Sequence, residues 1–205
     1  MVTKLRHGNA GFLQRLKADK VQQAFETMLR GPRLPAAPTP KNAIEEILDF
    51  ARWAPSGDNA QPWRFVVAAK EDAEGFARIL STLVPANQAW AEKAALLGIA
   101  VAQSNFEMNG NPNRFAAYDA GQAMAQVALQ AEAEGFHCHQ MGGFDAAKAR
   151  EVLGVPQGYE LMAAFAIGQQ GDPASLTNEG HRAQETAPGQ RKALDTLVFH
   201  GIWPK

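Results

Sequence analysis

The chain has 205 residues, of which 46% are hydrophobic and 20% are charged, and its formal net charge is −1. This length suits one domain with a sizeable core, and the near-neutral charge provides no basic surface for nucleic acid. No apolar run approaches the roughly 20 residues of a membrane helix, the N-terminus lacks a secretory apolar segment, and Cys138 has no second cysteine to pair with, so we expect a cytoplasmic protein with no membrane partner.

The first elements in chain order are two helices separated by a proline-rich stretch. A loosely amphipathic pattern predicts a helix over residues 11–30. Thr39 and Pro40 are typical of the start of a second helix, which is expected to end at Pro55. One face of this helix carries its apolar side chains, which are Ile44, Ile47, Leu48 and Ala51.

Four strands and three further helices are expected downstream. Aromatic, β-branched and apolar runs predict strands over 63–69, 96–102, 136–141 and 161–168. Helices are expected over 72–83, 119–134 and 146–153, the last with Asp145 as its N-cap and the second ending at Gly135. The polar residues 172–191 are expected to form an extended arm, which serves a function or a partner subunit. Strands interleaved with helices predict a three-layer α/β or α+β sandwich and leave the strand directions open.

The segment between the second helix and the first strand reads PSGDNAQPW. Ser56, Gly57, Asp58 and Asn59 bond to nearby backbone or tolerate unusual backbone angles, so local chemistry by itself favours a turn. Alternation in the following strand buries Trp63 and points Arg64 outward. Trp53 is also expected in the core, whereas Trp90 suits either the core or a cofactor.

The metal-ligand and nucleophile types at residues 137–139 carry a weaker signal. His137 and His139 share one face of the predicted strand, but no third ligand stands at a diagnostic spacing, so no metal is expected. Cys138 is expected on the opposite face as an inert thiol.

A longer string gives the segment a second interpretation. Ala54-Pro55-Ser56-x-x-Asn59-x-Gln61-Pro62-Trp63-x-Phe65 resembles the signature of the nitroreductase superfamily of flavin enzymes. Five further segments resemble family elements in the right order: Arg30-Gly31-Pro32-Arg33, Asn87-Gln88-x-Trp90, Asp119-x-Gly121-x-Ala123, Gly142-Gly143-Phe144-Asp145 and Arg191-Lys192-Ala193-Leu194. The resemblance divides the chain into an N-terminal extension, 1–28, and an FMN-binding domain, 29–205.

The resemblance implies an α+β three-layer α/β/α sandwich with a central, mostly antiparallel or mixed sheet, in an intertwined homodimer that shares its flavin sites. It implies FMN as the cofactor, NAD(P)H as the electron donor, and a small organic acceptor such as a nitroaromatic or a quinone. Hydride would pass through flavin N5 in ping-pong order, so no side chain is expected to be catalytic. The alternatives are a dehalogenating, dehydrogenating or flavin-consuming branch of the family, and a non-catalytic flavin-binding protein whose flavin face is blocked by Trp90.

The resemblance also implies which residues contact the cofactor. A phosphate dianion suits the fixed charge and fork of arginine, and the flavin ring suits amide, hydroxyl and backbone groups. The implied cofactor-binding residues are Arg30, Gly31, Arg33, Pro55, Ser56, Gly57, Asn59, Asn87, Gly142, Gly143, Arg191 and Lys192. Trp90, Arg114 and Phe115 are candidate substrate contacts.

Overall fold

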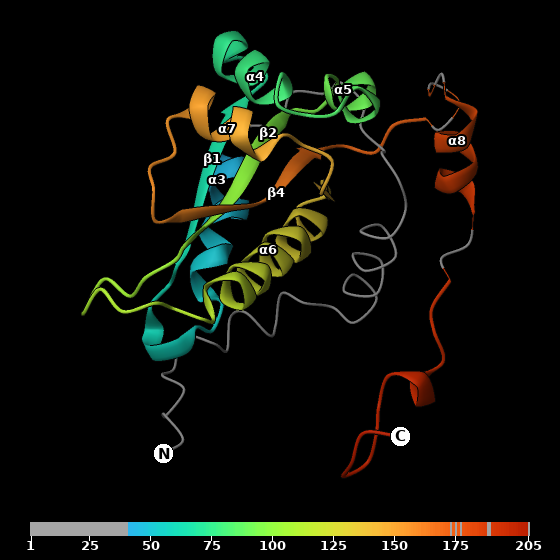
Figure 1. Cartoon of the computed structure of the whole chain (residues 1–205). Helices are drawn as coiled ribbons and strands as arrows, with labels where there is room; N and C mark the ends of the chain where they lie inside the picture. The colour runs from blue at the N-terminus through green and yellow to red at the C-terminus, as the bar shows by residue number, and fades with distance from the viewer. Residues whose placement is uncertain (1–40, 173, 175, 177, 188–189, 205) are drawn as a thin grey trace.

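A computed structural model describes residues 41–172, 174, 176, 178–187 and 190–204 (Figure 1). The helix expected over 11–30, the Thr39-Pro40 helix start and the N-terminal extension lie outside the described residues. The elements in chain order are α3 (Lys41–Asp49), η1 (Phe50–Trp53), η2 (Gly57–Asn59), β1 (Trp63–Ala69), α4 (Ala73–Leu80), α5 (Pro85–Ala91), β2 (Leu96–Gln103), α6 (Ala116–Ala133), β3 (His137–Met141), α7 (Ala146–Leu153), β4 (Tyr159–Gly168), α8 (Glu179–Thr186) and η4 (Leu194–Thr196).

The four strands form one antiparallel sheet in the order β1-β2-β4-β3. Trp63 pairs with Ala102 at one end of the β1–β2 ladder, and Ala69 pairs with Leu96 at the other. Strand β2 is buried along nearly its whole length, which explains why its sequence is a continuous apolar run rather than an alternating one. The strand directions left open by the sequence pattern are therefore all antiparallel.

Helices cover both faces of the sheet, which confirms the three-layer α+β fold. Residues of α3, η1 and α6 form one apolar core with one sheet face, including Ile47, Ala123, Val127 and Phe165. A second core joins the other face to α4, α5 and the end of α7, including Phe76, Ile79, Trp90 and Leu97. In Figure 1 the second group of helices lies above the sheet and α6 lies below it.

Helix ends follow the signals in the sequence at several places. Asp145 caps α7, because its carboxylate accepts a hydrogen bond from the Lys148 amide at 2.9 Å, as predicted. Helix α6 is followed by Gly135, whose φ of +82° is the left-handed angle expected after a helix C-terminus. The strand predicted over 63–69 has the same bounds as β1.

Three expectations need correction. Trp53 is 57% exposed rather than buried, because the chain tightens into the 3-10 turn η1 after Asp49 and leaves the buried face of the preceding helix. Helix α6 begins at Ala116, three residues before the expected start. The polar arm is not wholly extended, since Asn178 caps the helix α8 within it, accepting a hydrogen bond from the His181 amide.

The described part of the chain contains no helix with the length and apolar content needed to cross a membrane.

Candidate functional site

Residues 55–61, which we call the motif turn, have an unusual backbone. Asp58, Asn59 and Gln61 have φ values of +52°, +55° and +46°, and they are the three non-glycine residues with positive φ among those described. Asn and Asp tolerate this left-handed region better than other residues, yet each such residue still costs on the order of 1 kcal/mol. Other contacts must therefore hold the motif turn in this shape.

Hydrogen bonds inside the motif turn centre on Ser56. Its carbonyl accepts a bond from the Asn59 amide at 3.1 Å, and its Oγ accepts one from the Gln61 amide at 3.0 Å. Arg64 on β1 then donates to the Gln61 carbonyl at 2.9 Å. The Asn59 side chain is exposed, and no described residue is hydrogen-bonded to its amide group. The side-chain amide of Asn59 can thus bind a ligand beside the turn.

The start of α6 is hydrogen-bonded to the motif turn. The buried carboxylate of Asp119 accepts a hydrogen bond from the Gly57 amide at 3.0 Å, across 62 residues of sequence. A Cβ atom added to Gly57 would lie 3.5 Å from the Phe115 ring. In the sequence, Asp119 belongs to a segment that resembles a family helix, and no role at the site was predicted for it. An acidic residue among the buried alanines of an amphipathic helix was the signal that could have found it.

A second cluster forms where β3 leads into α7. The Asn87 amide on α5 donates to the carbonyl of Gly143 at 3.0 Å, and the Val84 amide donates to the same carbonyl at 3.0 Å. A Cβ atom at Gly143 would lie 2.6 Å from Asn87 Nδ2, whereas one at Gly142 would meet no atom within 4 Å. We call residues 142–143 the glycine turn. Its second glycine packs closely against Asn87, and a side chain added at its first would meet open space.

The same helix α5 carries Trp90, which is only 4% exposed and belongs to the second core. Its ring meets that of His139 edge to face, with the ring centroids 5.1 Å apart. Burial lowers the pKa of His139 from its usual value, so this imidazole is neutral near pH 7. Trp90 thus lies in the core, which is one of the two places that the sequence left open for it.

The motif turn and the glycine turn lie at different ends of the molecule. In Figure 1 the teal turn that follows α3 lies at the lower left, whereas α5 lies at the upper right. Within the described residues, no hydrogen bond joins the motif turn to Asn87 or to the glycine turn. One chain therefore presents two separated groups of the predicted cofactor contacts.

The two candidate substrate contacts at the start of α6 lie beside the motif turn. The Arg114 guanidinium lies over the Phe115 ring, 4.3 Å from its centroid, and Phe115 is 41% exposed. This arrangement leaves an aromatic surface next to Gly57 that an organic ligand can contact.

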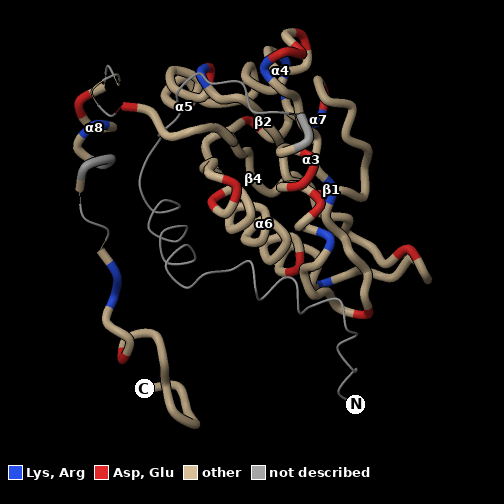
Figure 2. The backbone as a smooth tube through the Cα atoms, turned by 180° about the vertical axis from the view of Figure 1, so that it is seen from behind, with Lys and Arg blue, Asp and Glu red and all other residues tan. Residues whose placement is uncertain are grey.

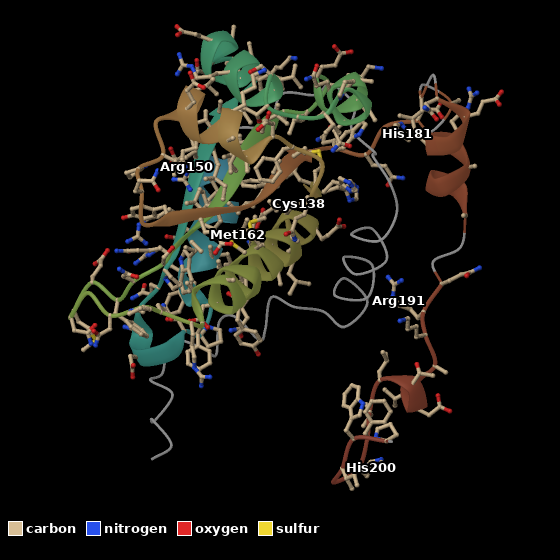
Figure 3. The ribbon with its side chains drawn as sticks, viewed as in Figure 1. Cys138, Arg150, Met162, His181, Arg191 and His200 are labelled. Atoms are coloured by element: carbon tan, nitrogen blue, oxygen red, sulfur yellow. The ribbon has the colours of Figure 1, made fainter. Side chains whose placement is uncertain are left out.

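The predicted phosphate contacts on the C-terminal arm lie beside neither turn. Arg191 and Lys192 are exposed on the C-terminal arm, which runs away from the body of the molecule in Figure 1 and in Figure 2. Figure 3 labels Arg191 on this arm. The Arg191 guanidinium donates to the neighbouring Gln190 carbonyl at 2.5 Å. Arg30, Gly31 and Arg33 lie outside the described residues.

The arm also exposes a series of large apolar side chains. The rings of Phe199 and Trp203 meet with centroids 4.7 Å apart, and Trp203 is 77% exposed. The other exposed apolar side chains of the arm are Leu194, Leu197, Val198 and Ile202. Exposed apolar side chains gathered on one segment are a feature typical of interaction surfaces.

Residues 137–139 lie at the edge of the sheet, with Cys138 and His139 on opposite faces as predicted. Cys138 is buried in the first core, where burial and, secondarily, the charge of Glu132 raise the pKa of its thiol to about 12. The thiol therefore stays protonated and unreactive. His137 Nδ1 lies 2.6 Å from a Glu132 carboxylate oxygen. The part of the chain that the structure describes has no group of three or more His, Cys, Asp or Glu side chains suited to a metal ion.

Comparisons with known proteins agree on one family. A family model described as the nitroreductase family matches residues 34–169, well over half of the chain. A solved structure described as an oxidoreductase containing FMN is 34% identical, with a TM-score of 0.81 over 88% of this chain and 91% of that one.

Of two further relatives, one has a lower sequence identity and the other matches over a shorter stretch. An NADH dehydrogenase of Thermus thermophilus is 28% identical over 193 residues, which covers 79% of this chain and 86% of that protein. A 15.4 kDa protein of Mycolicibacterium smegmatis is 38% identical over 90 residues, or 44% of this chain, and the match spans 60% of that protein's length.

Proposed function

We propose that this chain, which belongs to the nitroreductase family, is an FMN-dependent oxidoreductase that uses NAD(P)H to reduce a small organic acceptor such as a nitroaromatic or a quinone. The similar structure described as an oxidoreductase containing FMN supports the cofactor, and the similar NADH dehydrogenase supports the donor. When bound, FMN supplies hydride transfer at N5 between donor and acceptor in ping-pong order.

The observation that carries the proposal is the chemistry of the two turns. The pyrimidine edge of a flavin offers both hydrogen-bond donors and acceptors, and it needs partners of both kinds. The exposed side-chain amide of Asn59 offers a donor and an acceptor, and the Ser56 hydroxyl has a proton to donate. Asn87 donates through Nδ2 to the Gly143 carbonyl. Its Oδ1 can still accept a hydrogen bond, since no described residue donates to that oxygen. These residues fit a flavin ring, and we assign them to hold and orient it.

The separation of the two turns supports a homodimer. If the motif turn of one subunit lies beside the glycine turn of the other, both groups of contacts meet at one flavin, which explains why one chain keeps them apart. The exposed apolar arm supplies a surface for such an association, and it would carry Arg191 and Lys192 toward the phosphate. The role of the side chains is then to bind, orient and shield the cofactor.

Cofactor binding is tested first. FMN added to the purified protein should lose fluorescence and raise the melting temperature, since a ligand at 100 times its dissociation constant stabilises by about 2.7 kcal/mol. Replacing both Arg191 and Lys192 with Gln should weaken FMN binding about tenfold and leave riboflavin binding unchanged, because riboflavin lacks the phosphate. Arg78→Gln on α4, which removes a single positive charge elsewhere on the surface, is the control. A protein that binds no FMN would refute the proposal.

Turnover is tested next, with NADH and NADPH in turn and a quinone or nitroaromatic acceptor. Parallel lines in double-reciprocal plots are expected for ping-pong order. FMN binding without oxidation of either donor would favour the non-catalytic alternative. That alternative invoked Trp90 as a block over the flavin, and a ring that is 4% exposed in the core is poorly placed for this.

A further inference from the structure

Asp119 is a buried charge whose role the proposed function does not explain. It lies in the first turn of α6 and is 3% exposed, on a helix face otherwise buried through small apolar residues such as Ala116, Ala120 and Ala123. A buried carboxylate is costly unless hydrogen bonds or opposite charges compensate it. No described basic side chain forms an ion pair with Asp119. Its compensation must come from hydrogen bonds and from the positive end of the helix dipole.

Two hydrogen bonds reach this carboxylate. Oδ2 accepts from the Gly57 amide at 3.0 Å, and Oδ1 accepts from Gln122 Nε2 at 3.4 Å. The first is the shorter, and it connects two parts of the structure that are distant in sequence. Among the described residues, it is the one side-chain hydrogen bond that reaches residues 56–60 from another element. The motif turn is thus attached to the body of the molecule at Gly57 by Asp119.

This attachment falls where the backbone most needs support. Gly57 lies immediately before the left-handed residues Asp58 and Asn59 and immediately after Ser56. The bonds inside the turn fix its internal shape but not its orientation on α6. Without the Asp119 bond, the turn could relax toward ordinary backbone angles and reorient the side chains of Ser56 and Asn59.

We propose that Asp119 is a positioning residue for the flavin: its carboxylate holds the Gly57 amide and thereby keeps Ser56 and Asn59 in the orientation that receives the ring. This inference rests on the proposed function, because it takes the motif turn as a flavin contact. Asp119 itself acts through the backbone of the turn, and the cofactor need not touch it.

The test compares Asp119→Ala with Asp119→Asn. Alanine removes the acceptor, whereas asparagine keeps an oxygen that can accept from the Gly57 amide with about half the strength. Asp119→Ala should weaken FMN binding on the order of tenfold, and Asp119→Asn should stay within about threefold of the wild type. Gln130→Ala is the matched control: Gln130 is a buried polar residue of the same helix that bonds to Glu134, far from the turn. All affinities are measured well below the melting temperature of each variant.

Hydrogen exchange of the apoprotein gives a readout that needs no flavin. In Asp119→Ala the Gly57 amide should exchange at least about tenfold faster, with the change confined to the peptide covering residues 54–62. Gln130→Ala should leave that peptide protected. If Asp119→Ala instead speeds exchange along α6 and leaves residues 54–62 as protected as they are in Gln130→Ala, then Asp119 merely stabilises the helix and the inference is overturned.

The flavin result separates this inference from the proposed function. If the wild type binds FMN and Asp119→Ala binds it as tightly, or no more weakly than Gln130→Ala does, the positioning role is wrong while the proposed function stands. If the wild type binds no FMN, the proposed function fails and the flavin role of Asp119 fails with it, whatever the exchange shows.

Discussion

The motif turn and the glycine turn achieve a fixed backbone by different means. In the motif turn three non-glycine residues adopt left-handed angles. Ser56 and Asp119 accept backbone hydrogen bonds there and Arg64 donates one, and these bonds hold the turn in shape. In the glycine turn the absence of a side chain at Gly143 lets the Asn87 amide pack against its backbone. A surface turn held by hydrogen bonds can lose a side chain without losing the fold, whereas a new atom in a close-packed turn forces its neighbours to move.

The largest effect is expected from Gly143→Ala. Its Cβ would lie 2.6 Å from Asn87 Nδ2 and 2.9 Å from Val84 Cγ2, so these side chains must shift and the bond from Asn87 to the Gly143 carbonyl is disturbed. We expect the free energy of unfolding to fall by about 1–3 kcal/mol in denaturant titrations. Gly142→Ala, with no atom within 4 Å of its Cβ, should change it by less than about 1 kcal/mol. Similar losses in both variants would contradict the packing account.

Asn59→Gly should have the opposite profile. Glycine adopts the φ of +55° without strain, so the unfolding free energy should stay within about 1 kcal/mol of the wild type. Loss of the side-chain amide should weaken FMN binding about tenfold in fluorescence titrations. Gln61→Gly makes the same backbone change in the same turn and should bind FMN normally. Unfolding of Asn59→Gly without weaker FMN binding would reduce the motif turn to a structural connection.

A smaller, pH-dependent effect is expected at His139, on the side of the glycine turn. Burial lowers the pKa of His139 below its usual value of 6.5, so the unfolded chain takes up this proton first as the pH falls. The stability present above about pH 6.5 is then lost at lower pH, by at most about 1.4 kcal/mol per pH unit. His139→Phe should keep the ring against Trp90 and flatten the pH dependence of the melting temperature between pH 7 and 5. Parallel curves for both proteins would show that His139 protonates equally in both states.

The smallest effect is expected at the exposed side of the motif turn. Arg64 pairs with Glu107 at 2.9 Å, but both side chains are largely exposed. Such pairs contribute under about 1 kcal/mol, so Glu107→Gln should lower the unfolding free energy by less than about 0.5 kcal/mol. A larger loss would mean that Arg64 depends on Glu107 to hold the Gln61 carbonyl.

Local patterns in the sequence predicted the elements better than they predicted side-chain burial. Strand β1 and helix α7 follow from residue types within each segment, and their predicted bounds are those observed. The prediction that Trp53 is buried was wrong because its exposure depends on the change from α to 3-10 winding at Phe50. No residue near Phe50 indicates that change in the sequence. Asp119 was missed for a similar reason, since its partner Gly57 is 62 residues away.

The spatial separation of the predicted site residues could not be read from the sequence either. The motif identified Asn59, Asn87 and Gly143 by residue type and order, which carry no information on distance. The structure brings Asn87 to Gly143 and leaves the motif turn elsewhere, because the two turns belong to different ends of the three-layer fold. In the homodimer that we propose, a site built from two copies of the chain could not be recognised from the order of its residues.

The position of β4 in the sheet has a consequence for how the chain folds during synthesis. Strand β4 is the last of the four strands to be translated, yet it lies between β2 and β3. Until residues 159–168 emerge from the ribosome, β2 has an unpaired edge along a strand made almost entirely of buried apolar residues. The nascent chain therefore exposes an aggregation-prone edge over some 55 residues of elongation, and completion of the sheet must wait for a strand to insert between two others.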